Sequence, residues 1–488
     1  MRRCLLAATA LVALAAPTAS ALPKLPLSHQ GRWITDASGR VVILHGVNMV
    51  YKRPPYAPDE TGFGADDAKF LKREGYDNVR LGVIYAAVEP QPGVYDDAYL
   101  DRIARTVKIL GRHGISSMLD FHQDLYNERY QGEGWPEWAT IDDGLPAAPQ
   151  SGFPANYLVM PGLQRAFDNF WDNREGPEGV GLQDRYAAAW RHVAQRFRSS
   201  DDVMGYDLVN EPWPGTAWQD CINPAGCPAS DAKLHAFSAK MISAIREADR
   251  RHLVFYEPYV LFNFGAGTTI GPFGDPKLGF SFHDYCLSAG SSDSNEGCDT
   301  PDDLVFANAD AHAERTGDAL LLTEFGATRA VDILTAMVER ADEHMVGWQE
   351  WHYCGCDDPT TSGPGDKQAL VYDPAKPPRA GNIDDGKLDI LSRPYPEAVA
   401  GTPLEYAFDG TTKTFTLRWT RARASGRGAF GPKAVTEVRV PRRQYPQGYR
   451  VRAKGARVLS KRGAPILRLA ARRDVAEAQV TLTLTPSR

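Results

Sequence analysis

The stretch VMGYDLVNEP, residues 203–212, joins an apolar run to a polar end formed by Asn210, Glu211 and Pro212. An apolar run of this kind is typical of a strand buried on both faces, as in a parallel sheet covered by helices. The end of the run places a carboxylate between an amide side chain and a rigid proline. The segment as a whole therefore predicts a buried strand with a functional group at its end.

Seven similar runs occur along the chain and alternate with amphipathic stretches such as DDAYLDRIARTVKILGRHG, in which apolar residues recur every three or four positions. Parallel strands joined by helices need right-handed crossovers, and eight such units can close on themselves. We therefore predict an α/β fold with a (β/α)8 TIM barrel, and keep an open doubly wound sheet as the alternative. The other seven runs are VVILHGVNM (41–49), YDNVRLGV (76–83), ISSMLDFH (115–122), HLVFYEP (252–258), LGFSFHDY (278–285), ALLLTEFG (319–326) and MVGWQEWHY (345–353).

The pattern changes after about residue 400. Segments such as EYAFDGTTKTFTLRWTRA and AQVTLTLTP alternate apolar and polar residues, which predicts a C-terminal all-β sandwich over residues 401–488, after a catalytic barrel over 22–400. The net charge also differs between these two parts of the chain. Residues 401–488 carry nineteen Lys and Arg against five Asp and Glu, a net +14, whereas residues 22–400 carry −22.

The first residues, MRRCLLAATALVALAAPTASALPKL, combine two arginines, an apolar stretch and the small residues Ala19 and Ala21 on either side of Ser20. This pattern predicts a signal peptide over residues 1–21 that is cleaved after Ala21, and hence a secreted protein. A membrane span is the alternative, but the apolar part is short and contains Pro17.

Six cysteines remain after that cleavage, an even number that is consistent with disulfides in an exported chain. Two pairs at short separation in loops are expected to form local bridges, whereas the third pair is uncertain because so short a ring strains the bond. Zinc binding is the competing interpretation, but no histidine has the spacing of a zinc finger. The pairs are Cys221 with Cys227, Cys286 with Cys298, and Cys354 with Cys356.

Polar residues recur where the predicted strands end, which is the edge where barrel enzymes build their active sites. One such residue alone would be explained by local hydrogen bonding, but a set that converges on one rim indicates a site. The set comprises Arg80, His122, Asn210, Glu211, His283, Tyr285, Glu324, and Trp348 or Trp351.

Glu211 and Glu324 end strands that lie on opposite sides of the predicted barrel, and glycoside hydrolysis needs two carboxyl groups that flank the scissile bond. One is protonated and the other ionised. We expect Arg80 and Tyr285 to keep Glu324 ionised, and the nearby charge of Glu324 to raise the pKa of Glu211. Asn210 is placed to bind the sugar hydroxyl beside the reacting carbon.

The segments LVNEP and LLTEFG, together with Arg80, His122, the FHDY segment and a tryptophan on the last strand, resemble the family-five glycoside hydrolases of clan A. The resemblance covers residues from about 40 to 355. It implies retaining double displacement, with Glu211 as the acid/base and Glu324 as the nucleophile.

A finer resemblance rests on FHQDLYNERYQGEGWPEWA, on FPANYLVMPGLQRAFDNFWDN and on the β-domain entered through RPYPEAVAGTP. These segments are similar to secreted endoglycoceramidases, which implies cleavage of the β-linkage between the glycan and the ceramide of a glycosphingolipid. The resemblance also implies that Asp124 and Lys52 contact sugar. An endo-β-glucanase, a β-glucosidase or an endogalactosylceramidase of the same family stays open, as does a carbohydrate- or lipid-binding protein without catalysis.

Two features bear on a lipid-linked substrate. The loop LFNFGAGTTIGPFGDP (261–276) could contact an acyl chain or a membrane surface, or could instead pack Phe262, Phe264 and Phe273 into the barrel wall. The basic sandwich could hold the protein near an anionic membrane or sialylated glycans, or its arginines could only keep edge strands soluble. We expect no nucleic-acid partner, metal or cofactor, because the barrel is strongly acidic and no phosphate-binding glycine loop or metal-ligand set is present.

Overall fold

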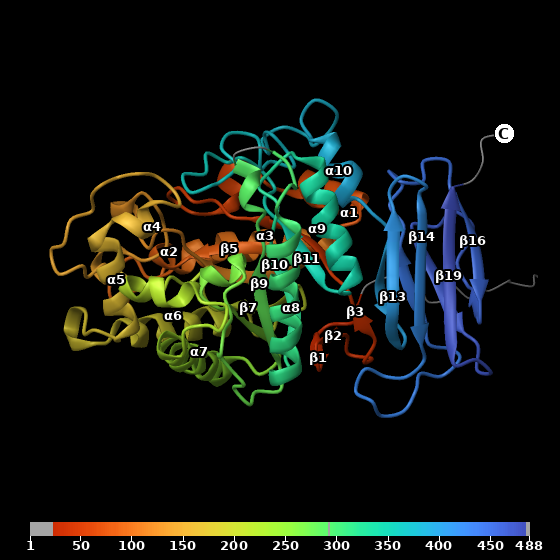
Figure 1. Ribbon diagram of the computed structural model, residues 1–488, viewed down its shortest axis with the longest axis horizontal. Coiled ribbons are helices and arrows are strands. Elements are labelled where there is room, and N and C mark those ends of the chain that lie inside the picture. The colour runs from red at the N-terminus through yellow and green to blue at the C-terminus, as the bar shows by residue number, and fades with distance from the viewer. Residues whose placement is uncertain (1–22, 291–292, 485–488) are drawn as a thin grey trace, which may run out of the picture.

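The computed structural model describes residues 23–290 and 293–484, and its centre is a closed barrel of eight parallel strands (Figure 1). Neighbouring strands follow the order β10-β11-β4-β5-β6-β7-β8-β9. The predicted (β/α)8 barrel is confirmed, and the open doubly wound sheet is excluded. The strands are β4 (His45–Met49), β5 (Asn78–Ile84), β6 (Ser116–His122), β7 (Val203–Asp207), β8 (Leu253–Tyr256), β9 (Leu278–His283), β10 (Ala319–Glu324) and β11 (Gly347–Glu350).

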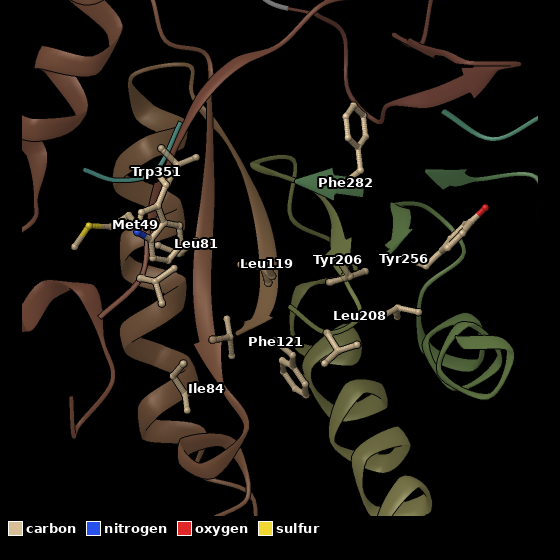
Figure 2. Packing of buried hydrophobic residues seen from close by; sticks show 14 of the residues in the cluster. Met49, Leu81, Ile84, Leu119, Phe121, Tyr206, Leu208, Tyr256, Phe282 and Trp351 are labelled. Carbon is tan, nitrogen blue, oxygen red and sulfur yellow. The ribbon is translucent and has the colours of Figure 1, made fainter. Parts of the chain in front are cut away.

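Helices surround the barrel, so nearly every strand residue is buried, and this explains the continuous apolar runs in the sequence (Figure 1). Figure 2 shows side chains of this core, among them Phe121 of β6, whose ring stacks on Trp190 of α6 with 3.9 Å between ring centroids. The helices are α1 (Ala65–Glu74), α2 (Tyr85–Val88), α3 (Asp97–Arg112), α4 (Asn156–Val159), α5 (Pro161–Trp171), α6 (Leu182–Phe197), α7 (Pro228–Ala248), α8 (Asp299–Thr316), α9 (Val331–Glu343) and α10 (Asp385–Leu391).

Two antiparallel sheets follow the barrel, in agreement with the predicted C-terminal β-domain. One has four strands in the order β13-β14-β19-β16, and the other has seven in the order β1-β2-β3-β12-β15-β18-β17. A common core that includes Val41, Tyr395, Trp419 and Leu467 lies between them. Their strands are β12 (Tyr395–Val399), β13 (Thr402–Asp409), β14 (Thr414–Thr420), β15 (Thr436–Arg439), β16 (Tyr449–Lys454), β17 (Ala456–Val458), β18 (Ile466–Ala471) and β19 (Glu477–Leu484).

The seven-stranded sheet also takes strands from the beginning of the chain, namely β1 (Ser28–Gln30), β2 (Trp33–Thr35) and β3 (Val41–Val42). The sequence predicted one strand over residues 41–49, but the structure divides this run. Val41 and Val42 pair with Val399 and Ala398 of β12, and the barrel strand β4 begins only at His45. The same segment closes the bottom of the barrel, where Ile34 and Leu44 pack in one apolar cluster with Met118, Met204, Phe255 and Leu321.

The two expected disulfides, Cys221–Cys227 and Cys286–Cys298, are confirmed, and Cys354 also pairs with Cys356. In the part of the chain that the structure describes, no helix combines the length and the apolar character that a bilayer span requires. The predicted signal peptide over residues 1–21 lies outside the described residues and stays a prediction.

Candidate active site

The turn after β7 presents Glu211 at the rim of the barrel in a strained backbone conformation. Its φ is +41°, in the left-handed region that side-chain-bearing residues rarely adopt. Gln123 holds the turn by donating hydrogen bonds to the carbonyl oxygens of Asn210 (2.8 Å) and Glu211 (3.0 Å), and the backbone N–H of Glu211 donates to Glu257 Oε2 at 2.8 Å. Such strain persists where surrounding contacts over-determine a conformation, commonly at functional sites.

Glu211 and Glu324 face each other across this rim, and both are buried. One oxygen from each carboxyl group and one nitrogen of His283 all lie within 4.8 Å of one another. Retaining glycosidases hold their two carboxyl groups about 5–5.5 Å apart, whereas inverting enzymes need about 6.5–9.5 Å to admit water between them. The short separation fits the retaining arrangement.

Glu324, at the end of β10, accepts a hydrogen bond on each oxygen. Arg80 Nη1 donates to Oε1 at 2.5 Å and the Tyr285 hydroxyl donates to Oε2 at 2.8 Å. Burial acts to lower the pKa of Arg80, but the surrounding carboxylates outweigh it and raise that pKa well above the usual value. Arg80 is fully buried and also contacts Asp120, Asp207 and Glu257 at 2.9–3.1 Å.

Glu211 receives both of its side-chain hydrogen bonds on Oε1, from Asn263 Nδ2 at 2.7 Å and from His283 Nδ1 at 2.9 Å. Burial is the main cause that raises the pKa of Glu211, and the charge of Glu324 adds to it, while His283 acts in the opposite direction. The direction expected from the sequence is therefore confirmed, but the predicted cause, the charge of Glu324, is secondary to burial.

The pKa of His283 is set by two opposing effects. Burial acts to lower its pKa, but the charges of Glu257 and Glu324 and the hydrogen bonds to Glu211 and Glu257 raise that pKa well above its usual value. These contacts favour the protonated form of the ring, whose Nδ1 lies 2.9 Å from Glu211 and 3.6 Å from Glu324.

Lys52 is the centre of a second polar cluster, beside the carboxylate pair. Its buried Nζ lies 2.6 Å from Asp124, 3.3 Å from Asp358 and 2.9 Å from the Thr360 hydroxyl. Burial lowers the pKa of Lys52, but Asp124 and Asp358 outweigh burial and raise it, so the ammonium stays charged. The cluster forms a polar floor of fixed donors and acceptors.

His122 joins this cluster through Asp120, which accepts from its Nδ1 at 2.7 Å, and through Asp124 at 3.6 Å. Burial acts to lower the pKa of His122, but the charge and hydrogen bond of Asp120 raise it to about 10. The Trp351 ring stacks on His122 at 5.2 Å between centroids, with Lys52 Nζ 4.5 Å from the Trp351 centroid.

The two tryptophans of the last strand have different places. Trp351 lines the cleft, whereas Trp348 is fully buried against His45 and is not brought to it. Asn210 is held from both ends of its amide, because Oδ1 accepts from Arg80 at 2.9 Å and Nδ2 donates to the Gln123 carbonyl at 3.0 Å. Asn210 is therefore fixed in the same buried network in which Arg80 holds Glu324.

The cleft above these groups has a volume of about 480 Å³ and a lining of two kinds. Lys52, Asp124 and Thr360 contribute polar groups, whereas most of the other lining residues are apolar. Of the three phenylalanines in the 261–276 loop, Phe264 is 44% exposed and lines the cleft, whereas Phe262 is buried and Phe273 half-buried. The apolar lining includes Phe153, Tyr157, Leu158, Trp213, Trp218, Val260, Leu261, Phe264, Leu287 and Ala327.

Two groups of potential metal ligands are present among the described residues, although the sequence suggested none. They are His122, Asp124 and Glu133, and the set formed by Glu211, His283 and Glu324. Lys52 pairs with Asp124 of the first set and Arg80 with Glu324 of the second, and the pKa of the histidine in each set is raised. Burial raises the pKa of Glu133 well above its usual value, which disfavours the ionised form that a metal would need. The donor sets therefore fit a network of ion pairs and hydrogen bonds better than a metal centre.

A family model described as Cellulase (glycosyl hydrolase family 5) matches residues 35–357, which is more than half of the chain and includes the entire barrel. The chain belongs to glycoside hydrolase family 5. A second model, the glycoside hydrolase family 5 C-terminal domain, matches residues 393–484 and so covers most of the β-domain.

Relatives within family 5 cover nearly the whole chain. It is 35% identical to endoglycoceramidase I of Rhodococcus hoagii over 464 residues, 92% of this chain and 87% of that protein. It is also similar to two solved structures of endo-glycoceramidase II from Rhodococcus sp. One is a lactosyl-enzyme intermediate (30% identity, TM-score 0.75, 92% of this chain and 99% of that chain). The other is a ganglioside GM3 complex (29% identity, TM-score 0.74, 93% and 99%).

This family 5 protein is a retaining glycoside hydrolase, and several residues in or around its site were not predicted from the sequence. Glu257 ends the predicted strand HLVFYEP and could have been found by the strand-end rule that found Glu211. Asn263 lies within the loop considered only for its phenylalanines. Asp358 and Thr360 follow the last strand, beyond residue 355, where the resemblance noted in the sequence ends. No periodicity marks these loop positions.

Proposed function

We propose that this family 5 hydrolase cleaves the β-glycosidic bond between the oligosaccharide and the ceramide of glycosphingolipids. The observation that carries the proposal is the mixed lining of the cleft, which combines the buried charges of Lys52 and Asp124 with apolar side chains such as Leu158 and Phe264. The two carboxylates, Glu211 and Glu324, line the same cleft. A substrate that fills such a cleft is a sugar joined to a hydrocarbon chain.

In the first step, Glu324 acts as nucleophile. Its carboxylate oxygen attacks the anomeric carbon, the bond from that carbon to the ceramide oxygen breaks, and a glycosyl-enzyme forms. Arg80 and Tyr285, each bonded to one oxygen of Glu324, fix the group in the cleft and stabilise its negative charge. The same contacts stabilise the carboxylate when it leaves in the second step.

Glu211 acts as the acid and then as the base. Oε1 accepts from His283 and Asn263, and Oε2 makes no hydrogen bond within residues 23–290 and 293–484, so Oε2 is the atom that holds the transferable proton. This proton goes to the departing ceramide oxygen. In the second step, Oε2 takes a proton from water as the water attacks the anomeric carbon, which releases the reducing oligosaccharide.

The polar cluster orients the first sugar. Asp124 and Lys52 offer an acceptor and a donor for adjacent hydroxyls, and Trp351 supplies a ring face in the same cleft. Asn210 keeps one amide hydrogen after its bond to Gln123, and this hydrogen serves the hydroxyl next to the reacting carbon. His122 lies at the same place, with Nε2 3.6 Å from Asp124 and its ring stacked on Trp351, and it stays a predicted sugar-binding residue.

We assign the lipid to the apolar part of the cleft lining. Leu158, Phe264 and Leu287 are 47%, 44% and 68% exposed along the cleft, an unfavourable arrangement in water that is relieved when hydrocarbon covers them. The names of the Rhodococcus relatives and the ganglioside GM3 complex of one of them support the same substrate class.

Secretion belongs to the same proposal. A cleaved signal peptide would deliver the enzyme to glycolipids outside the cell that makes it, and the three disulfides are consistent with an oxidising compartment.

Product analysis tests the proposed function against the alternatives within the family. The enzyme is incubated separately with lactosylceramide, galactosylceramide and cellotetraose, and the products are identified by mass spectrometry. We expect lactosylceramide to be the preferred substrate, with intact lactose and ceramide as its products. Faster hydrolysis of cellotetraose would indicate an endo-β-glucanase, release of single sugars a β-glucosidase, and preferential cleavage of galactosylceramide an endogalactosylceramidase.

A further inference from the structure

The two sheets of the β-domain end in adjoining edge strands that carry a concentration of positive charge. β16 is the last strand of the four-stranded sheet, β17 is the last strand of the seven-stranded sheet, and Gly455 alone joins them. Figure 1 shows β16 on the side of the β-domain away from the barrel. Residues 449–484 contain nine Lys and Arg against two Asp and Glu.

Six of these cations form what we call the basic edge. On β16, Arg450 and Arg452 lie opposite Thr483 and Thr481 of β19, so alternate residues of the strand point to the outer face of the sheet. All six are exposed, and none forms an ion pair with any residue that the structure describes. The basic edge comprises Arg450, Arg452, Lys454, Arg457, Lys461 and Arg462.

The lack of partners is not a general property of cations in this protein. Arg443, elsewhere in the β-domain, contacts Glu74, Asp385 and Asp389 at 2.9–3.0 Å. The electrostatic potentials of neighbouring charges of one sign add when no counter-charge is near. The resulting positive potential extends into solvent and attracts a polyanionic surface.

Two exposed apolar residues accompany these charges. Val458 and Leu459 are 44% and 49% exposed, and they lie between Arg457 and Lys461 in the chain. Apolar side chains flanked by basic ones suit the boundary between lipid headgroups and acyl chains. A purely polar polyanion offers no partner for them.

The aromatic side chains of the β-domain argue against a neutral glycan as the partner. Sugar rings bind proteins by stacking on exposed aromatic faces, but all seven aromatic residues between 401 and 484 are buried. The outer face of the four-stranded sheet instead presents threonines beside the basic edge. The buried aromatic residues are Tyr406, Phe408, Phe415, Trp419, Phe430, Tyr445 and Tyr449.

We propose that the basic edge is a binding surface for the anionic face of a lipid bilayer. The six cations attract anionic headgroups over a range of about 10 Å, and Val458 and Leu459 then enter the interface. Binding at the basic edge requires neither Glu211 nor Glu324, so this proposal can be tested independently of the proposed hydrolysis.

Vesicle sedimentation tests this proposal with the full chain. Vesicles of phosphatidylcholine alone are compared with vesicles that also contain phosphatidylglycerol. Each basic residue near an anionic bilayer contributes about a fivefold gain in partitioning, so neutralising three residues is expected to lower binding about 100-fold. The test variant carries Arg450→Gln, Arg452→Gln and Lys454→Gln. The control removes three exposed, unpaired cations of the barrel helices, by Lys69→Gln, Lys108→Gln and Arg112→Gln.

The proposal predicts binding to the phosphatidylglycerol vesicles that the test variant loses and the control variant keeps, with unchanged melting temperatures. Val458→Ser with Leu459→Ser should weaken binding to vesicles but not to soluble polysialic acid. Equal binding to both kinds of vesicle, or equal loss in both charge variants, would overturn the proposal. Binding to polysialic acid that matches binding to vesicles, with no effect of the serine substitutions, would identify an anionic glycan as the partner instead.

Discussion

Replacing Glu211 by alanine removes one of the two carboxyl groups of the cleft and its hydrogen bonds to Asn263 and His283, while His283 keeps its contact with Glu257 at 3.4 Å. If Glu211 is the acid/base, the two steps of the reaction should respond differently. The first step loses proton donation to the leaving group, and the second loses activation of water.

The expected magnitude depends on the leaving group. The alkoxide of ceramide is a poor leaving group, so loss of the acid should lower kcat/KM by about 100- to 10,000-fold, or roughly 3–5 kcal/mol of transition-state stabilisation. The proton of Glu211 is held in a buried site only 7% exposed, so water is poorly placed to replace it. An aryl glycoside, whose phenolate departs unaided, should keep its rate in the first step.

Pre-steady-state kinetics on an aryl β-lactoside measures both steps. The variant should release a burst of phenol and then turn over slowly, because the glycosyl-enzyme on Glu324 accumulates. Azide needs no base and should accelerate turnover of the variant, but not of the wild type, with β-lactosyl azide as the product. An α-azide would show single displacement. Equal losses on both substrates without azide rescue would assign the proton donor to another group, His283 being the nearest.

Three further variants test other parts of the site. Glu324→Ser should abolish hydrolysis without lowering the melting temperature. Hydrolysis by this variant at the wild-type rate would show that Glu324 is not the nucleophile. His283→Gln should move the alkaline limb of the kcat/KM profile to higher pH, because the charge of His283 lowers the pKa of Glu211; an unchanged limb would refute this coupling. Leu287→Ser should raise KM for lactosylceramide several-fold but leave KM for an aryl lactoside unchanged. The control Val331→Ser removes another exposed apolar side chain, outside the cleft, and should change neither KM. Equal effects of Leu287→Ser on both substrates would exclude a lipid contact.

The barrel could be predicted because its strands are buried on both faces, which makes each a continuous apolar run, and because polar residues interrupt these runs where the strands end. Arg80, Glu211 and Glu324 were found in this way, and the structure brings them together. The rule says nothing about side-chain direction, so it could not separate Trp351, which lines the cleft, from Trp348, which is buried against His45.

The pairing of strands that are distant in the chain could not be predicted from the sequence. Val41 and Val42 continue the apolar run of β4, yet they pair with β12, more than three hundred residues away in the chain. Only the folded β-domain supplies that partner. The causes of the pKa shifts were hidden for the same reason. Burial raises the pKa of Glu211, and the groups packed around it, such as Asn263, come from loops whose position no local pattern fixes.

Hydrolysis of lactosylceramide in water labelled with heavy oxygen tests the central claim most directly. The account predicts two products, lactose that carries the label on its reducing carbon and ceramide without label, because water attacks the glycosyl-enzyme at the sugar. Galactose with glucosylceramide would contradict cleavage next to the lipid, and label in the ceramide would contradict attack at the anomeric carbon.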